Sequence, residues 1–138
     1  MNNLETANQL VESQPFSRLL GVKVTAIEGA SVELSLPLRP ELTQHYGSAH
    51  GGVLAFLADN SLTYSGGISM GTLVVTSEFK INFIRPGIGD MLIARSKTIH
   101  AGRNQAVTQC DIFVVKDGIE KLCATAQGTI VKIGTPPK

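Results

Sequence analysis

One carboxylate, Asp59, stands in a stretch of the chain that is otherwise almost entirely apolar. The residues before it, 53–58 (VLAFLA), leave no polar face for more than one helical turn. A helix that is apolar on every side is normally buried, and an acid there is costly unless a neighbour compensates it or a reaction uses it. Thr63 follows one helical turn later, on the same face, where its hydroxyl can reach Asp59 or a water beside it. Asp59 is therefore either the carboxylate of a chemical site or a helix residue satisfied by Thr63 and the backbone.

The start of the same stretch is suited to holding a negative charge. Gly51 and Gly52 come directly before the apolar run, where a helix would begin. The first backbone N–H groups of a helix have no partner inside it, and the helix dipole adds to their attraction for an oxyanion. Glycine also lets a substrate approach the backbone closely, although the pair could simply permit a tight turn into the helix. Beside His50 and Asp59, the two glycines favour a functional site.

Three pieces of sequence connect this pattern with a known family. They are the segment 44–59 with the arrangement Q-x5-HGG-x6-D, the FIRPG segment at 83–87, and the Gly102-Arg103 pair in a later turn. Together they resemble the hotdog-fold acyl-CoA thioesterases, and most closely the branch typified by the phenylacetate-pathway thioesterase. The similarity extends over about residues 16–133. It implies hydrolysis of the thioester bond of an acyl-CoA to a free carboxylic acid and coenzyme A.

Thioester hydrolysis needs a donor for the carbonyl oxygen as it gains charge, and a group that delivers water or attacks directly. The resemblance assigns the first task to the Gly51 N–H, with the Gln44 amide as a second donor or a holder of water. It makes Asp59 the nucleophile or the general base, supported by Thr63. His50 either fixes the loop or contacts the sulfur side of the thioester.

Further site residues are expected on the next strand and in the later turns. Thr76 or Ser77 would hold the attacking water, and a one-residue ambiguity in the preceding loop leaves that choice open. Gly52 would lie against the substrate. The resemblance suggests that Arg103 and Arg85 meet the phosphates of coenzyme A. The acyl pocket is expected to draw on the following side chains: Phe56, Leu57, Tyr64, Ile68, Met70 and Phe83.

Two other functions share the fold. Hotdog hydratases and dehydratases also combine a histidine with a helix carboxylate, but their histidine acts on an α-carbon proton and their motif lacks the HGG-x6-D arrangement. A non-catalytic acyl-CoA-binding module is the other alternative. Such sensors normally carry a DNA-binding segment, and the residues before Phe16 are too few for one. The motif therefore favours the thioesterase.

Helix geometry separates the two ends of the motif. Over nine residues a helix rises ~13.5 Å and turns through ~900°, so His50 and Asp59 face opposite sides. They cannot both reach one carbonyl from a single helix. Two subunits with antiparallel helices would bring the Gly51 end of one against Asp59 of the other. We therefore predict a homodimer with shared active sites, as the resemblance also implies, and a pairing of two dimers is a further expectation.

These residues must be positioned by an α+β domain in which an antiparallel sheet wraps around one long central helix, the hotdog fold. Alternating apolar residues predict strands, and the KDG at 116–118 predicts a hairpin turn. We expect a single domain over 1–138, with an N-terminal helix within 1–15, a flexible tail at 134–138, and 73–84 as a central strand near the dimer axis. The other expected elements are a helical turn at 16–20, strands at 22–28 and 31–38, a central helix at 51–66 closed by Gly66-Gly67, and strands at 90–100, 105–115 and 120–132.

Composition excludes several classes of function. The chain has 12 basic and 11 acidic residues with no basic run, which argues against nucleic-acid binding. No apolar stretch reaches the ~18 residues of a membrane span, and the N-terminus lacks the pattern of a signal peptide. Cys110 and Cys123 fit small buried hydrophobes in a reducing compartment, so we expect a cytoplasmic protein. No metal or other cofactor is expected, since coenzyme A is part of the substrate.

Overall fold

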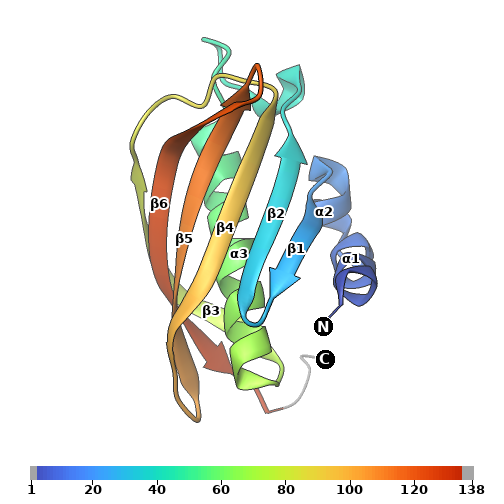
Figure 1. Cartoon of the computed structure of the whole chain (residues 1–138), viewed down its shortest axis with the longest axis vertical. Coiled ribbons are helices and arrows are strands. Elements are labelled where there is room, and N and C mark those ends of the chain that lie inside the picture. Colours follow the sequence, from blue (N-terminus) through green and yellow to red (C-terminus); the bar gives the residue numbers. More distant parts are fainter. Residues whose placement is uncertain (1–2, 135–138) are drawn as a thin grey trace.

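The computed structural model describes residues 3–134, which fold into a six-stranded antiparallel sheet wrapped around one long helix (Figure 1). The helix is α3, Gly51–Met70, and the strand order is β1-β2-β4-β5-β6-β3. The α+β hotdog fold expected from the sequence is confirmed. The predicted tail lies outside the described residues, apart from Gly134. The other elements are α1 Leu4–Ser13, α2 Pro15–Leu20, a 3₁₀ turn Pro40–Leu42, β1 Lys23–Glu28, β2 Ser31–Pro37, β3 Val74–Phe83, β4 Met91–Ala101, β5 Gln105–Lys116 and β6 Ile119–Lys132.

The central helix α3 is longer than the sequence predicted. Closure at Gly66-Gly67 is wrong, because both glycines lie inside the helix, which continues to Met70 and is capped by Gly71 in the left-handed conformation (φ 63°). A Cβ atom on Gly66 would lie 2.8 Å from the side chain of Ile130 on β6. The glycine therefore serves close packing of α3 on the sheet rather than termination of the helix.

Alternate residues along the strands point toward α3 and build the core. In β2 these are Val32, Leu34 and Leu36, and in β5 every second residue from Ala106 to Val114 is buried. The period of two follows from strand geometry, which sends neighbouring side chains to opposite faces. The same alternation places Glu33, Arg95 and Gln109 on the outer face of the sheet, which α3 does not cover (Figure 1).

The sheet also holds α3 through hydroxyl groups. Ser96 donates to the carbonyl oxygen of Ser61 at 2.8 Å, and Thr108 donates to that of Leu62 at 3.1 Å. Both hydroxyls are buried, so each needs such a partner. These bonds fix the position of α3 on the sheet, and with it the position of every functional group that α3 carries.

Both cysteines are buried and unpaired, as predicted. Burial raises the pKa of the Cys110 thiol to about 12 and that of the Cys123 thiol to about 11. The thiols therefore stay protonated at neutral pH and pack as small apolar side chains.

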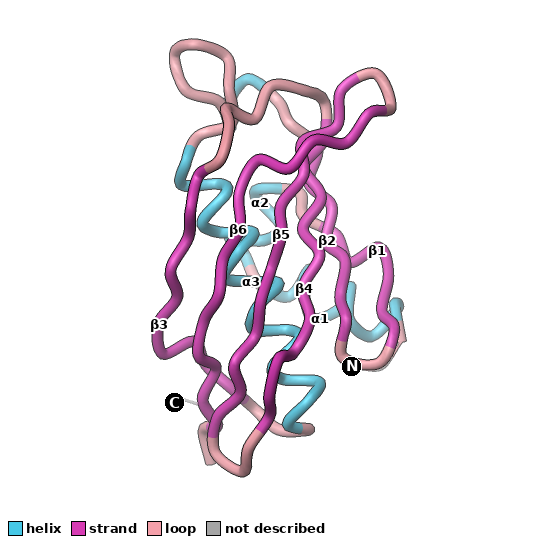
Figure 2. Tube along the Cα trace, turned by 60° about the vertical axis from the view of Figure 1, so that its left-hand side comes forward, coloured by secondary structure: helices cyan, strands magenta, loops and turns pink. Residues whose placement is uncertain are grey.

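The two edge strands of the sheet differ in what lies beside them: α1 lies beside β1, and β3 forms the opposite edge (Figure 2). Along β1, the Asn8 side chain of α1 donates to the Val24 carbonyl and accepts from its N–H, each at 2.9 Å, which occupies that edge at Val24. Along the other edge, β3 pairs only with β6 within residues 3–134. Within one chain 73–84 is thus an edge strand, and its expected place as a central strand near a dimer axis stays a prediction. An uncovered edge is a surface on which another strand can pair.

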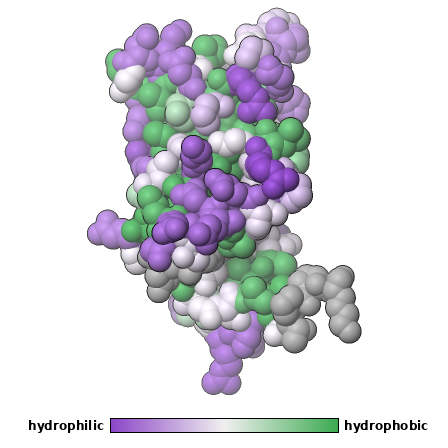
Figure 3. All heavy atoms as spheres, turned by 90° about the vertical axis from the view of Figure 1, so that its right-hand side faces the viewer, coloured by the Kyte–Doolittle hydropathy of each residue, from purple (hydrophilic) through white to green (hydrophobic). Residues whose placement is uncertain are grey.

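The face that carries α1 and α2 mixes polar and apolar side chains (Figure 3). Among residues 3–134, no helix has the length and apolar character needed to cross a membrane.

Candidate active site

The half-buried Asp59 is held by two hydroxyls. Thr76, on β3, donates to Asp59 Oδ1 at 2.6 Å. Thr63, one turn further along α3, has its hydroxyl 2.7 Å from that of Thr76, 2.7 Å from the Asp59 carbonyl oxygen and 3.4 Å from Asp59 Oδ1. Its single proton therefore serves one of these three acceptors at a time. Within residues 3–134, no hydrogen bond reaches Asp59 Oδ2. One carboxylate oxygen is thus fixed and the other is free for a reactant.

The structure places Thr76, and not Ser77, beside Asp59. The pairing of β3 with β6 shifts register between Thr76 and Glu78, which leaves Ser77 as the extra residue of a β-bulge. Ser77 is exposed, whereas Thr76 is half-buried and points toward α3. The bulge is what turns the Thr76 hydroxyl toward the carboxylate.

The N-terminus of α3 offers one free backbone donor. His50 is the N-cap residue, and its Nδ1 accepts the Gly52 N–H at 2.8 Å. Only an unprotonated Nδ1 can accept this bond. The Gly51 N–H has no acceptor among the described residues, and Gly51 is exposed. By satisfying Gly52, His50 leaves Gly51 as the N–H that can bind an oxyanion.

Gly51 opens onto a hollow of about 360 Å³. Gln44 lines the same hollow, and its Nε2 donates to Ser48 Oγ at 2.6 Å. An amide nitrogen carries two hydrogens, so Gln44 keeps one for a ligand. Phe83 and Arg85, from the end of β3 and the segment after it, complete the wall around these donors.

Asp59 lines a second hollow, of about 390 Å³, between α3 and the α1–α2 junction. Three of its nine lining residues are aromatic: Phe16 and Phe56 meet edge to face at 5.3 Å between ring centroids, and Phe79 closes the side at β3. Gly52 and Ala55 border the same space. Three further lining residues are polar: Gln14, Ser17 and Asn60. The combination suits an acyl chain that approaches Asp59.

Several expected pocket residues lie elsewhere. Leu57 and Tyr64 are buried in the core, and neither they nor Ile68 and Met70 line the two hollows. The Tyr64 hydroxyl has no hydrogen-bond partner among the described residues, and burial raises its pKa to about 12 against a smaller opposite effect of Gln14. Of the predicted acyl-pocket residues, Phe56 meets the Asp59 hollow and Phe83 meets the Gly51 hollow.

Within one chain the two hollows have no lining residue in common. The free N–H of Gly51 and the amide of Gln44 belong to one hollow, and the carboxylate of Asp59 belongs to the other. The helix itself imposes this separation, as the spacing of the motif predicted.

The two arginines expected to meet phosphates also lie apart. Arg85 lines the Gly51 hollow. Arg103 lies in the β4–β5 turn, where the carbonyl of its neighbour Asn104 accepts the Lys132 N–H at 2.9 Å, at the end of the sheet where α3 ends (Figure 1). In a single chain Arg103 therefore cannot share a ligand contact with Gly51.

Sequence reasoning missed Gln14, Ser17, Asn60 and Phe79 around Asp59. They come from α1–α2, α3 and β3, and only the folded chain brings them together. Of these four, only Asn60 could have been suspected from the sequence, because it is a second polar residue on an otherwise apolar helix. No group of three metal-binding side chains occurs in the described part of the chain.

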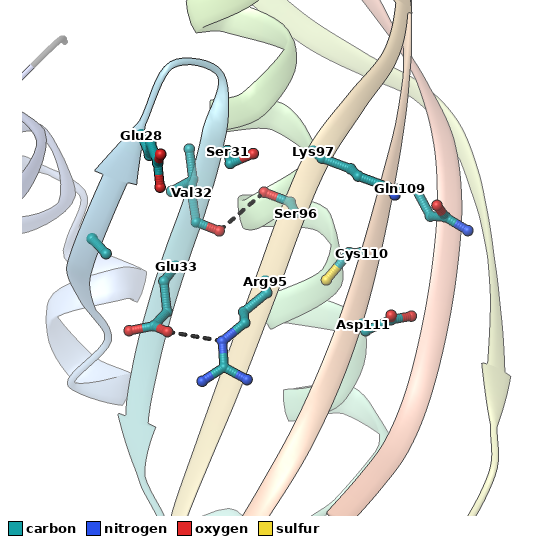
Figure 4. A pocket seen from close by; sticks show the side chains of 11 residues that line it. Glu28, Ser31, Val32, Glu33, Arg95, Ser96, Lys97, Gln109, Cys110 and Asp111 are labelled. Carbon is teal, nitrogen blue, oxygen red and sulfur yellow. Dashed lines mark hydrogen bonds and ion pairs between the residues drawn. The ribbon is translucent and has the colours of Figure 1, made fainter. Parts of the chain in front are cut away.

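A third hollow lies on the outer face of the sheet, away from α3 (Figure 4). Five of the eleven residues that line it are charged, and Arg95 reaches toward Glu33. Neither Asp59 nor Gly51 takes part in it.

A helix N-terminus with a free N–H can stabilise an oxyanion, and a carboxylate with a free oxygen can act as a base or a nucleophile. Both groups suit the hydrolysis of an acyl compound. The chain belongs to the thioesterase superfamily, whose family model matches residues 46–121.

Solved structures and a named relative agree with this assignment. A thioesterase family protein from Silicibacter pomeroyi superposes with a TM-score of 0.88 and 28% identity, covering 96% of this chain and 100% of that one. A thioesterase from Haemophilus influenzae gives a TM-score of 0.84 and 30% identity over 95% and 90% of the two chains. The acyl-coenzyme A thioesterase PaaI of Escherichia coli is 28% identical over 94% of this chain and 91% of its own length.

Proposed function

We propose that two copies of this chain together build a site that hydrolyses acyl-CoA to a free carboxylic acid and coenzyme A. The chain is a thioester hydrolase by its family, and the E. coli relative is named for action on acyl-coenzyme A. One observation carries the shared site: the oxyanion donor and the carboxylate of a single chain line separate hollows.

The reaction follows from the groups on each side of the shared site. The Gly51 N–H and Gln44 amide of one copy bind the thioester oxygen as it gains negative charge. The free Oδ2 of Asp59 from the other copy either takes a proton from the attacking water or attacks the carbonyl carbon itself. In either route the C–S bond breaks and the leaving thiolate takes up a proton. In the second route the acyl group is then held on Asp59 as an anhydride, and a water molecule hydrolyses it to the free acid and restores the carboxylate. In both routes Thr76 and Thr63 hold the carboxylate in place.

The uncovered edge supports the assembly. Asn8 interrupts the β1 edge at Val24, whereas the ten-residue strand β3 has an edge on which a second sheet can join. Antiparallel pairing of two β3 strands reverses one α3 relative to the other. Gly51 of one copy then approaches Asp59 of its partner. Pairing of two such dimers is a further expectation.

The two hollows suggest how the substrate lies. The acyl group enters the aromatic space beside Phe16, Phe56 and Phe79. Coenzyme A leaves past Gln44, and Arg85 is the nearer of the two expected arginines to its phosphates. Arg103 can meet the same coenzyme A only from the second copy. Coenzyme A is part of the substrate, and the reaction needs no other cofactor. The unpaired cysteines are consistent with a reducing compartment, so we place the enzyme in the cytoplasm.

A mixed dimer tests the shared site. Asp59→Asn and Gln44→Ala should each be nearly inactive alone. In a dimer of one of each, one site inherits both lesions and the other inherits none, so the purified hybrid should show about half of wild-type activity. Two different affinity tags and tandem purification isolate the hybrid, and hydrolysis is followed by the thiol released.

The control is a dimer that carries Asp59→Asn on both differently tagged copies, which should stay inactive. Sites built within single chains would leave every site of the hybrid damaged. Hybrid activity no higher than that of the two parent variants would therefore contradict the proposal.

A further inference from the structure

The turn at 44–48, just before α3, carries an aromatic pair that the proposed reaction does not use. The rings of His45 and Tyr46 lie 4.0 Å apart between centroids, tilted by 45°. The Tyr46 side chain is 82% exposed, the highest value among the exposed large apolar side chains of residues 3–134. Placing a large ring in water brings the fold no gain from burial. Exposed aromatic groups become informative when they lie beside a binding site.

The turn that displays these rings is firmly built. Gly47 donates its N–H to the Gln44 carbonyl at 2.9 Å, and the Gln44 N–H donates to the Ser48 carbonyl at 2.9 Å. Gly47 has φ 83°, a conformation that favours glycine. Ala49 then ties the turn to the segment after β3, donating to the Gly87 carbonyl at 2.8 Å. A ring held on such a turn loses little conformational freedom when a ligand binds.

The position of the turn points to the ligand. Its base, Gln44 and Ser48, lines the hollow that contains Gly51 and Arg85. A thioester bound at Gly51 sends the rest of coenzyme A out through the mouth of this hollow. Arg85 forms no ion pair among the described residues, so its charge is available to phosphates. Beyond the phosphates, coenzyme A ends in an adenine, which stacks well on aromatic side chains.

We propose that Tyr46, backed by His45, is the platform on which the adenine ring of coenzyme A stacks. The proposal rests on the acyl-CoA hydrolysis proposed above and adds the contact that recognises the nucleotide end. Phe83 is unsuited to this role, because its ring lies within 4 Å of the Cβ position of Gly51, beside the thioester itself. Tyr46 contacts no reacting atom and contributes binding only.

Three substrates with the same acyl group locate the contact: the acyl-CoA, the acyl-phosphopantetheine and the acyl-pantetheine. Only the acyl-CoA contains the adenine base that would stack on Tyr46. Tyr46→Ala should therefore raise KM about 5- to 30-fold for the acyl-CoA and leave KM for the other two substrates unchanged. Turnover should not change, because the contact is equal in ground and transition states. Arg85→Ala should raise KM for both substrates that carry phosphate. Tyr46→Phe should behave as wild type, since it keeps the ring.

Ile99→Ala is the matched control, because it removes an exposed apolar side chain (53% exposed) from β4, outside both hollows. It should leave all three KM values unchanged. A Tyr46→Ala variant with an unchanged KM for acyl-CoA, or with equal rises for all three substrates, would overturn the platform. So would a change in the oligomer mass of that variant, which would assign the ring to assembly.

Direct binding separates this inference from the proposed function. Calorimetric titration with adenosine 3′,5′-bisphosphate needs no turnover, and Tyr46→Ala should weaken its affinity at least about 5-fold. If the wild type hydrolyses none of the three substrates, the proposed function fails, and the titration still decides the platform. Equal affinity in wild type and variant would refute it.

Discussion

Carboxylates occur in two opposite settings in this protein. On the outer face of the sheet, Glu33 and Glu120 flank Arg95, with contacts of 2.9 and 2.6 Å (Figure 4 shows the Glu33 side). On α3, Asp59 meets only hydroxyl groups, and among residues 3–134 no cationic side chain forms an ion pair with it. The first setting neutralises its carboxylates, and the second positions its carboxylate without neutralising it.

The difference matters because a paired carboxylate is a weak base. The hydrogen bond from Arg95 lowers the pKa of Glu120, and the pKa of Glu33 is lowered first by the Thr25 hydroxyl and then by Arg95. A carboxylate stabilised in this way binds a proton less tightly, so it is a weaker base. Among the described residues, Asp59 keeps one oxygen free of partners, which is what a base or nucleophile requires.

Removing the charge of Asp59 should have the largest effect. Asp59→Asn is expected to lower kcat at least ~100-fold, the scale of a positioned base or nucleophile, while the melting temperature changes little. Asp111→Asn is the matched control, since Asp111 also accepts a threonine hydroxyl, from Thr125 at 2.7 Å, but on the outer face. It should keep normal kcat. Equal losses in both variants would remove the distinction between the two settings.

Removing the hydroxyl that positions Asp59 should have an intermediate effect. Thr76→Val keeps the shape of the side chain but loses a hydrogen bond to a charged group, so kcat should fall about 10-fold. Ser77→Ala, at the exposed bulge position next to it, should be neutral. Steady-state kinetics on the two variants measure this directly. A larger loss in Ser77→Ala would mean that the strand presents the other residue to the carboxylate.

Breaking the outer ion pairs should have the smallest effect, and on stability alone. Glu33 and Glu120 have pKa values below normal in the folded state, so their contribution is complete above the ordinary glutamate pKa of about 4.3 and is lost as pH falls below it. Arg95→Met should lower the free energy of unfolding by at most about 1 kcal/mol at pH 7, because the groups are partly exposed. The deficit should shrink toward acid pH, with kcat unchanged.

Lys97→Met is the control for that series, as Lys97 lies on the same face of β4 and takes part in no ion pair among the described residues. Urea unfolding at several pH values should give a constant, small difference for it. A deficit of Arg95→Met that grows as pH falls would reverse the sign of the linkage and contradict the pairing.

Local patterns in the sequence carried much of the fold and part of the site. The apolar run before Asp59 predicted a buried helix. Alternation of apolar residues predicted the ends of the strands to within about two residues. The spacing of Gly51 and Asp59 on one helix foretold that a single chain keeps them apart. Patterns of this kind are readable because they depend on neighbours within a few residues.

Other features depended on contacts between distant segments. A one-residue bulge in the pairing of β3 with β6 chose Thr76 over Ser77. Gly66 was predicted to end the helix, but it is a glycine because α3 packs closely against Ile130 at this position. The α1–α2 junction brought Gln14 and Ser17 to the Asp59 hollow.

By itself the sequence determined which candidate groups stand along α3 and in what order, because residue type and helical spacing are local properties. Only the tertiary structure decided which hydroxyl holds Asp59, which backbone N–H stays free at Gly51, and which edge of the sheet is left uncovered. Those outcomes follow from strand register and from packing between segments far apart in the chain. A shift of one residue in register would exchange the side chains that face the helix, and no local pattern of residues encodes it.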